Sequence, residues 1–162
     1  PSDKSLVIVS NNGKRELAMQ KWGFTVSFTK RLLINARSET ASSKPTFRDS
    51  FIHRRGLIPV SGYYEWKNEN GKKLKYKIYS EEDIFSLACI YKPSIDSLGN
   101  KLKEYTILTR PASKEIQDIH DRMPVIIDKK YEDVWMDDSI RDVSLLNNII
   151  VSSNKRLSYK KV

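Results

Sequence analysis

Three short segments of the 162-residue sequence place polar side chains in otherwise apolar surroundings. The first, residues 34–40, carries an amide, a guanidinium and a carboxylate on Asn35, Arg37 and Glu39. Alternate residues of an extended chain face the same side, so these three side chains would face together. The amide can orient a reacting oxygen and the guanidinium can hold a phosphate. A structural polar network at the base of a loop explains the same residues equally well.

The second segment, residues 58–66, sets Glu65 between the aromatic side chains of Tyr64 and Trp66. Aromatic neighbours partly desolvate a carboxylate, which raises its pKa and suits a general acid or base at neutral pH. Taken alone, a Glu on a strand edge that pairs with one of the many lysines is the favoured interpretation.

The third segment, residues 118–124, crowds His120 between two carboxylates and the guanidinium of Arg122. Histidine is the side chain whose ordinary pKa lies near physiological pH, and loops held by a rigid scaffold often carry functional residues. His120 is therefore a candidate acid–base group. The other histidine, His53, lies in a His-Arg-Arg string and is interpreted as surface charge.

Composition narrows the classes of function. Lys and Arg number 29 against 20 Asp and Glu, a net charge of +9 that attracts polyanions, most commonly nucleic acid. The single cysteine, Cys89, excludes an internal disulfide and a cysteine-based zinc site and fits a reducing compartment. Metal-binding, Walker, dinucleotide and nucleophile-elbow motifs are absent, and the apolar runs are too short for a membrane span. We expect no metal, no cofactor and no membrane.

The apolar pattern predicts many strands with short helices between them, an α+β fold with a largely antiparallel curved sheet or barrel. Strands are expected at residues 6–9, 17–24, 57–66, 74–78, 84–91, 104–109, 124–127 and 149–151, with a hairpin turn at Asn70-Gly71. Helices are expected at residues 46–54, 113–119 and 131–135, and after a capping box at 139–142. Residues 30–39 show no clean period, which predicts a surface loop.

Together the three segments resemble the SRAP (SOS-response-associated peptidase) family, the abasic-site processing proteins. The resemblance covers residues 1 to about 151 and rests on strings in the family's order: WGF at 22–24, INARSET at 34–40, RRGLIP at 54–59, GYYEW at 62–66, YTILT at 105–109 and IHDRMP at 119–124. It implies a single α+β domain around a barrel-like sheet, which binds single-stranded DNA in a basic groove. It also implies a DNA-damage protein that crosslinks to abasic sites. The family's nucleophile is an N-terminal cysteine, whose amine and thiol close a thiazolidine on the sugar aldehyde.

Carried over motif by motif, the resemblance makes Asn35, Glu65 and His120 the catalytic residues. Asn35 would orient the sugar or the amine, and Glu65 would manage the proton of the attacking amine. His120 would act as general acid and base on the sugar hydroxyl during ring opening and closing.

The same resemblance indicates which residues contact DNA. Arg37 and Arg122 would hold the phosphates that flank the lesion. Phe28 sits near the place where the family carries aromatic side chains that stack on or wedge between bases, and Arg48 adds to the binding charge. The expected partners are single-stranded and abasic-site DNA. We expect a monomer in the cytoplasm, associated with the nucleoid if the source is bacterial.

The sequence departs from the family pattern at its start. The family opens with Met-Cys-Gly-Arg, whereas this sequence begins at Pro1, and Cys89 lies in an apolar stretch where an inert thiol is expected. We therefore expect one domain over residues 1–162 that lacks the catalytic N-terminal segment and its nucleophilic cysteine. The family's crosslinking, lyase-type and self-peptidase (hydrolase) activities depend on that cysteine. Two alternatives stay open: a non-covalent single-stranded DNA-binding module, and a peptidase or amidohydrolase that uses Glu65 and His120.

Overall fold

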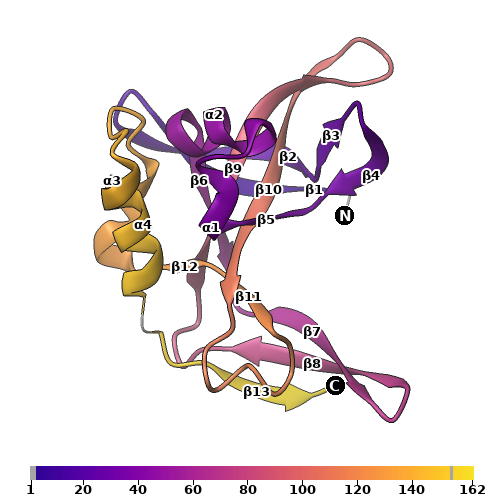
Figure 1. The fold of residues 1–162 in the computed structure, drawn as a ribbon. Helices are drawn as coiled ribbons and strands as arrows, with labels where there is room; N and C mark the ends of the chain where they lie inside the picture. Colours follow the sequence, from indigo (N-terminus) through magenta and orange to yellow (C-terminus); the bar gives the residue numbers. More distant parts are fainter. Residues whose placement is uncertain (1–2, 154) are drawn as a thin grey trace.

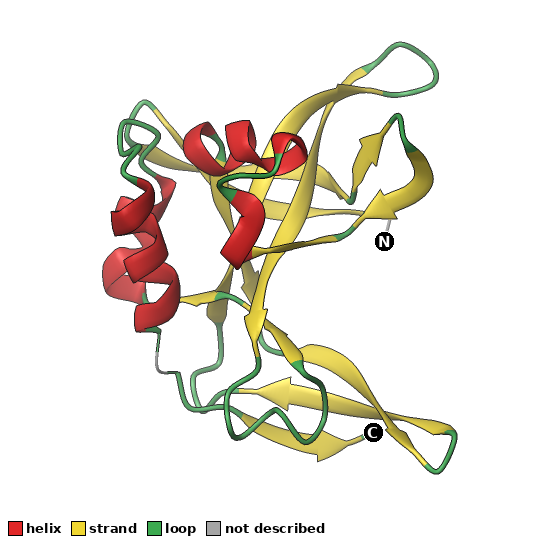
Figure 2. Cartoon of the chain, viewed as in Figure 1, coloured by secondary structure: helices red, strands yellow, loops and turns green. Residues whose placement is uncertain are grey.

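The computed structural model describes residues 3–153 and 155–162, and five of its strands close into a ring. These strands are β1 (Lys4–Asn11), β2 (Lys14–Trp22), β6 (Arg55–Val60), β9 (Phe85–Ile95) and β10 (Lys101–Pro111). Their order is β10-β2-β1-β6-β9, and β9 pairs with β10 to complete the barrel (Figures 1 and 2). Within the ring the β2–β10 pair is parallel and the other pairs are antiparallel. The expected α+β fold around a largely antiparallel, barrel-like sheet is confirmed.

Shorter strands extend the barrel and place the segments of interest on it. β5 (Asn35–Arg37) and β11 (Arg122–Pro124) both pair with β10, and β12 (Ile126–Ile127) pairs with β9. β3 (Phe24–Val26) and β4 (Thr29–Leu33) form a separate hairpin. β7 (Tyr63–Glu69), β8 (Lys72–Tyr79) and β13 (Ser158–Lys161) make a three-stranded sheet that projects below the barrel in Figure 1.

Helices cover the side of the barrel that lies on the left in Figure 1. They are α1 (Ser38–Ala41), α2 (Pro45–His53), the 3-10 turn η1 (Lys129–Tyr131), α3 (Glu132–Met136) and α4 (Val143–Ser152). Strand alternation separates two buried clusters. On β6, Leu57 packs with the helices around Trp135, in the cluster called here the helix-side core. Ile58 packs in the second cluster, inside the barrel, with Val7 and Cys89.

One cation lies within the helix-side core. Arg55, at the start of β6, is 2% exposed. Its guanidinium donates to the backbone carbonyls of Phe51, Ile52, Trp135, Asp137 and Ile140 and lies over the Trp135 ring. Desolvation lowers the Arg55 pKa to about 10, so the side chain stays charged at neutral pH. Arg55 therefore ties α2 and α3 to the edge of the barrel.

Several predictions of helices and strands were wrong. Residues 149–151 belong to α4, not to a strand, because Ile149 and Ile150 bury one face of a helix that begins after Asp142. The Asp142 carboxylate accepts from the N–H groups of Ser144 and Leu145, so the cap lies at Asp142 and not at residue 139. Residues 30–39, expected as a loop, form β4, β5 and the start of α1.

Two further segments differ in detail. Residues 113–119 form consecutive turns instead of a helix. The expected strand 57–66 is interrupted at Gly62, whose φ of +152° and close approach to the Ile78 carbonyl exclude a side chain. The hairpin at Asn70-Gly71 is present, with positive φ at both residues. Within the described residues, no helix is long and apolar enough to cross a membrane.

Candidate active site

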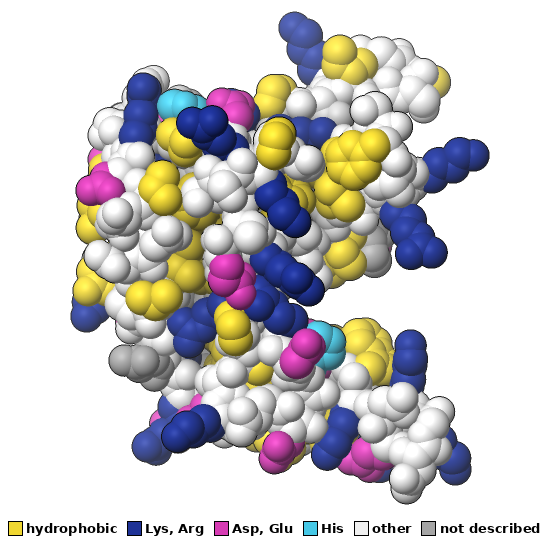
Figure 3. Space-filling model, in the orientation of Figure 1, with side chains coloured by type: hydrophobic (Ala, Val, Ile, Leu, Met, Phe, Trp, Pro, Cys, Tyr) yellow, Lys and Arg dark blue, Asp and Glu magenta, His cyan; other side chains and the backbone are white. Residues whose placement is uncertain are grey.

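A pocket of about 460 Å³ lies where the barrel meets the three-stranded sheet. Five side chains singled out in the sequence line it: Asn35 and Arg37 from β5, Glu65 from β7, His120 from the segment before β11, and Arg122 from the first position of β11. Figure 3 shows a deep hollow between these two parts of the molecule, with Lys and Arg side chains gathered on its barrel side. The fold therefore brings together the polar residues of all three segments.

The position of β5 is set by its parallel pairing with β10. Asn35 lies opposite Ile107 and Arg37 opposite Thr109, while Ala36 between them is buried in the helix-side core. The alternation puts the Asn35 and Arg37 side chains on the pocket side, as the sequence predicted. The strand ends at Arg37, so Glu39 lies in α1 and not on the same strand face.

Glu39 nevertheless reaches the site through Arg122. Its carboxylate accepts from both terminal nitrogens of the Arg122 guanidinium, with Oε2 at 2.9 Å from Nη2. Nη2 also donates to the Thr109 carbonyl at 2.8 Å. The hydrogen bonds from Arg122 lower the pKa of the Glu39 carboxyl to about 2. Arg122 is thus a neutralised, fixed guanidinium, and its contact with a DNA phosphate stays a prediction.

This ion pair predicts a pH dependence of stability. Because the folded-state pKa of Glu39 lies below its ordinary value of 4.5, the pair stabilises the fold fully above pH 4.5 and ceases to do so as pH falls toward 2. Glu39→Gln should therefore lower the free energy of unfolding at pH 7, and the difference from wild type should shrink on acidification. Urea unfolding of both proteins between pH 7 and 2.5 measures it. A difference that does not change with pH would contradict the pairing.

Glu65 is a half-buried carboxyl in the lining of the pocket. Desolvation raises its pKa, and the charge of nearby Asp121 raises it further. The imidazole of His120 and the backbone N–H of Trp66 oppose this shift by stabilising the carboxylate. Glu65 and His120, 55 positions apart in the sequence, are therefore electrostatic neighbours with the character of a proton-transfer pair.

The ring of His120 is oriented by its own turn. The Arg122 backbone N–H donates to Nδ1 at 2.9 Å, and the Asp121 carboxylate lies 3.1 Å from the same nitrogen. The Arg122 carbonyl also lies 3.1 Å from Nδ1, so the turn holds this edge of the ring. The side chain is 41% exposed, so Nε2 is available to a ligand as donor or acceptor.

Aromatic side chains that the sequence did not mark as functional belong to the same site. Tyr63, Tyr64 and Trp66 line the pocket beside Glu65, and Tyr64 and Trp66 are 46% and 51% exposed. The ammonium of Lys75 lies 4.0 Å from the centre of the Tyr64 ring. The signal was present in the alternation of β7, where large aromatics fall on its exposed positions.

Two predicted DNA contacts lie outside the pocket. Phe28 is 71% exposed in the turn between β3 and β4. Arg48 lies on α2, in a separate shallow hollow beside His53. Neither belongs to the pocket lining, and their roles in DNA binding stay predictions.

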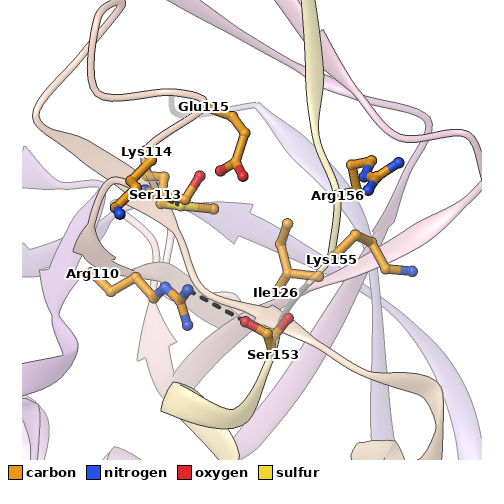
Figure 4. A pocket seen from close by; sticks show the side chains of 9 residues that line it. Arg110, Ser113, Lys114, Glu115, Ile126, Ser153, Lys155 and Arg156 are labelled. Atoms are coloured by element: carbon orange, nitrogen blue, oxygen red, sulfur yellow. Dashed lines mark hydrogen bonds between the residues drawn. The ribbon is translucent and has the colours of Figure 1, made fainter.

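A second hollow, of about 410 Å³, shares the Met123 side chain with the first and is also rich in cations (Figure 4). Two of its cations, Arg110 and Lys155, have protein partners. Arg110 donates to the carbonyls of Ile150 and Ser153 at the end of α4, which suits a cation at a helix C-terminus. Lys155 pairs with Glu82, and Glu115 adds a carboxylate to the lining. These contacts give Arg110 and Lys155 structural roles in this hollow.

Comparisons with known proteins identify the family of this chain. The whole chain, residues 1–162, matches the family model described as SOS response associated peptidase (SRAP). Abasic site processing protein YoqW of Bacillus subtilis is 32% identical over 157 residues, which cover 93% of this chain and 70% of that protein. Abasic site processing protein YedK of Escherichia coli is 31% identical over 139 residues, covering 84% of this chain and 62% of YedK.

Solved structures of other proteins share this fold. A Bacteroides thetaiotaomicron protein superposes with a TM-score of 0.84 at 24% identity, covering 99% of this chain and 74% of that one. A Bordetella bronchiseptica protein superposes with the same TM-score at 23% identity. The family model matches residues 1–162 and YoqW is more than 30% identical over most of both chains, so the chain belongs to the SRAP family of abasic site processing proteins.

Proposed function

We propose that this chain binds single-stranded DNA and receives an abasic residue in the pocket formed by β5, β7 and β11. The observation that carries the proposal is the convergence of Asn35, Glu65 and His120 with two arginines on one pocket. The net charge of +9 supplies attraction for the phosphate backbone. The relatives YoqW and YedK are abasic site processing proteins, which supports an abasic substrate.

The proposed chemistry is capture of the sugar aldehyde by an N-terminal cysteine. The amine adds to the aldehyde and water leaves, giving an imine; the thiol then adds to the imine carbon and closes a thiazolidine. Glu65 would take the proton from the amine, His120 would exchange a proton with the sugar hydroxyl, and Asn35 would hold the sugar oxygen. The self-peptidase step, removal of a leading Met, would use the same acid–base groups.

Cys89, the single cysteine of these 162 residues, does not fit the nucleophile's role. Its side chain is fully buried inside the barrel, and burial raises the pKa of the thiol above its ordinary value. A buried, protonated thiol is inert. The proposed covalent activity therefore requires a cysteine presented to the pocket from the amino-terminal side.

A second candidate, a non-covalent single-stranded DNA-binding module, is favoured by the exposed aromatics. Tyr64 and Trp66 stand at the rim of the pocket, where successive bases can stack on them. This function needs no nucleophile. It differs from the first candidate in predicting equal affinity for abasic and intact single strands.

Binding itself gives the first test. The chain should bind single-stranded DNA in preference to blunt duplex, with an affinity that falls steeply as salt rises. Arg37 is exposed, and none of the described carboxylates forms an ion pair with it. Arg37→Ala should reduce the slope of log affinity against log salt by about 0.7, the counterion release expected for one phosphate on a single strand. Fluorescence anisotropy at several salt concentrations measures the preference for single strands and the salt slope.

Arg48→Ala is the matched control, because it removes the same charge from α2, outside the pocket. A smaller loss for Arg48→Ala than for Arg37→Ala locates binding at the pocket. Equal losses would mean that the surface charge binds DNA without a defined site. Equal affinity for blunt duplex, or an isotherm that salt does not change, would refute the proposal.

A further inference from the structure

The hydroxyl of Tyr63 is a buried polar group without a hydrogen-bond partner among the described residues. Tyr63 opens β7 and lines the pocket, and its ring packs against the cluster inside the barrel. Glu65 lies two positions along the same strand, so both side chains project to the same face. Tyr64 and Trp66 project to the more exposed face of the strand and line the pocket at its rim. Tyr63 and Glu65 thus form the inner wall of the site.

An unpaired buried hydroxyl is unfavourable for folding, since its lost hydration is not replaced. Phenylalanine would fill the same space without that penalty. Such groups in native structures call for an explanation, and one explanation is a ligand that supplies the partner. Burial and the nearby charge of Glu65 both raise the pKa of the Tyr63 phenol, so the group remains protonated and acts as a donor.

The two side chains have complementary hydrogen-bonding capacity. A protonated phenol can donate, whereas a carboxylate can only accept. A sugar hydroxyl placed between them accepts from one and donates to the other, using both its lone pair and its proton. A furanose ring oxygen carries no proton, so it can accept a hydrogen bond from the phenol but cannot donate one to the carboxylate.

We propose that the Tyr63 hydroxyl donates a hydrogen bond to a hydroxyl of the abasic sugar while the Glu65 carboxylate accepts a hydrogen bond from that same hydroxyl. This inference rests on the proposed function and adds to it a specificity-determining residue. An abasic sugar carries a hydroxyl where an intact nucleotide carries its base. Tyr63 and Glu65 therefore recognise an abasic residue by the hydroxyl that stands in place of the base, in addition to the space that the missing base leaves.

Two unreactive oligonucleotide probes test this pair directly. One carries an abasic residue reduced with borohydride, which keeps hydroxyls and has no aldehyde; the other carries a tetrahydrofuran residue, which lacks the C1′ hydroxyl. Wild type should bind the reduced probe more tightly, by roughly 2- to 12-fold for one neutral hydrogen bond. Tyr63→Phe should remove most of this preference. Tyr159→Phe, which deletes an exposed hydroxyl on β13, outside the pocket lining, should keep it.

Stability supplies the second measurement. Because the Tyr63 hydroxyl has no partner in the fold, Tyr63→Phe should melt at the same temperature as wild type or above it. A clear loss of stability would identify a structural partner and overturn the inference. So would a hydroxyl preference that survives Tyr63→Phe, or a wild type without any preference between the probes. Failure of the proposed function looks different: wild type would then bind neither abasic probe better than blunt duplex.

Discussion

Replacing His120 with Ala should slow adduct formation with abasic single-stranded DNA by about 10²–10⁴-fold, the contribution that a positioned acid–base group typically makes. The experiment uses the chain extended at its amino terminus by the first segment of an abasic site processing relative, so that the mature protein begins with cysteine. His120 is held by the Arg122 N–H at Nδ1 and lies beside Glu65. Its Nε2 is then free to exchange a proton with the sugar hydroxyl as the ring opens. Denaturing gels sampled over time give the rate.

Two controls keep this result interpretable. His53→Ala removes the other histidine, which lies on α2 away from the pocket, and should leave the rate unchanged. The 162-residue chain without the extension should give no heat-stable adduct, because an amine without the adjacent thiol forms only a reversible imine. A stable adduct from that chain that survives Cys89→Ser would contradict the proposed chemistry. An unchanged rate for His120→Ala would remove the acid–base role from this residue.

The largest expected loss of stability follows from Arg55→Ala. Five backbone carbonyls, among them Trp135 O at 2.6 Å and Phe51 O at 3.0 Å, depend on this one guanidinium. Each buried acceptor left without a donor costs about 1–3 kcal/mol, and water entering the new cavity recovers part of that. We expect the free energy of unfolding to fall by about 4 kcal/mol or more, as measured by urea denaturation.

The neighbouring arginine provides the control. Arg54 pairs with the exposed Asp49 and donates to the Tyr91 carbonyl at 3.1 Å, so Arg54→Ala should cost about 1 kcal/mol. Arg55→Lys keeps the charge but not the fork of donors, and its loss should lie between the two. A loss below about 1 kcal/mol for Arg55→Ala would mean that these carbonyls find other donors, and that Arg55 does not tie the helices to the barrel.

Local patterning determined much of this protein. The alternation of apolar residues predicted most of the barrel strands, and Asn70-Gly71 predicted its hairpin, because both depend on neighbours in the chain. The strings around Asn35, Glu65 and His120 predicted the family and one shared pocket. The same local reasoning predicted a strand at residues 149–151, because a short apolar run has no period that separates a strand from a buried helix.

Only the tertiary structure decided how distant segments meet. Pairing with β10 makes residues 35–37 a strand although their sequence has no strand period, because the partner's backbone supplies the hydrogen bonds. The same packing joins Glu39 to Arg122 and buries the Tyr63 hydroxyl beside Glu65. Burial, ion pairing and pKa depend on atoms that approach through space. The sequence by itself therefore determined which chemical groups the site contains, and the fold decided which of them are neutralised, which are desolvated and which remain open to a ligand.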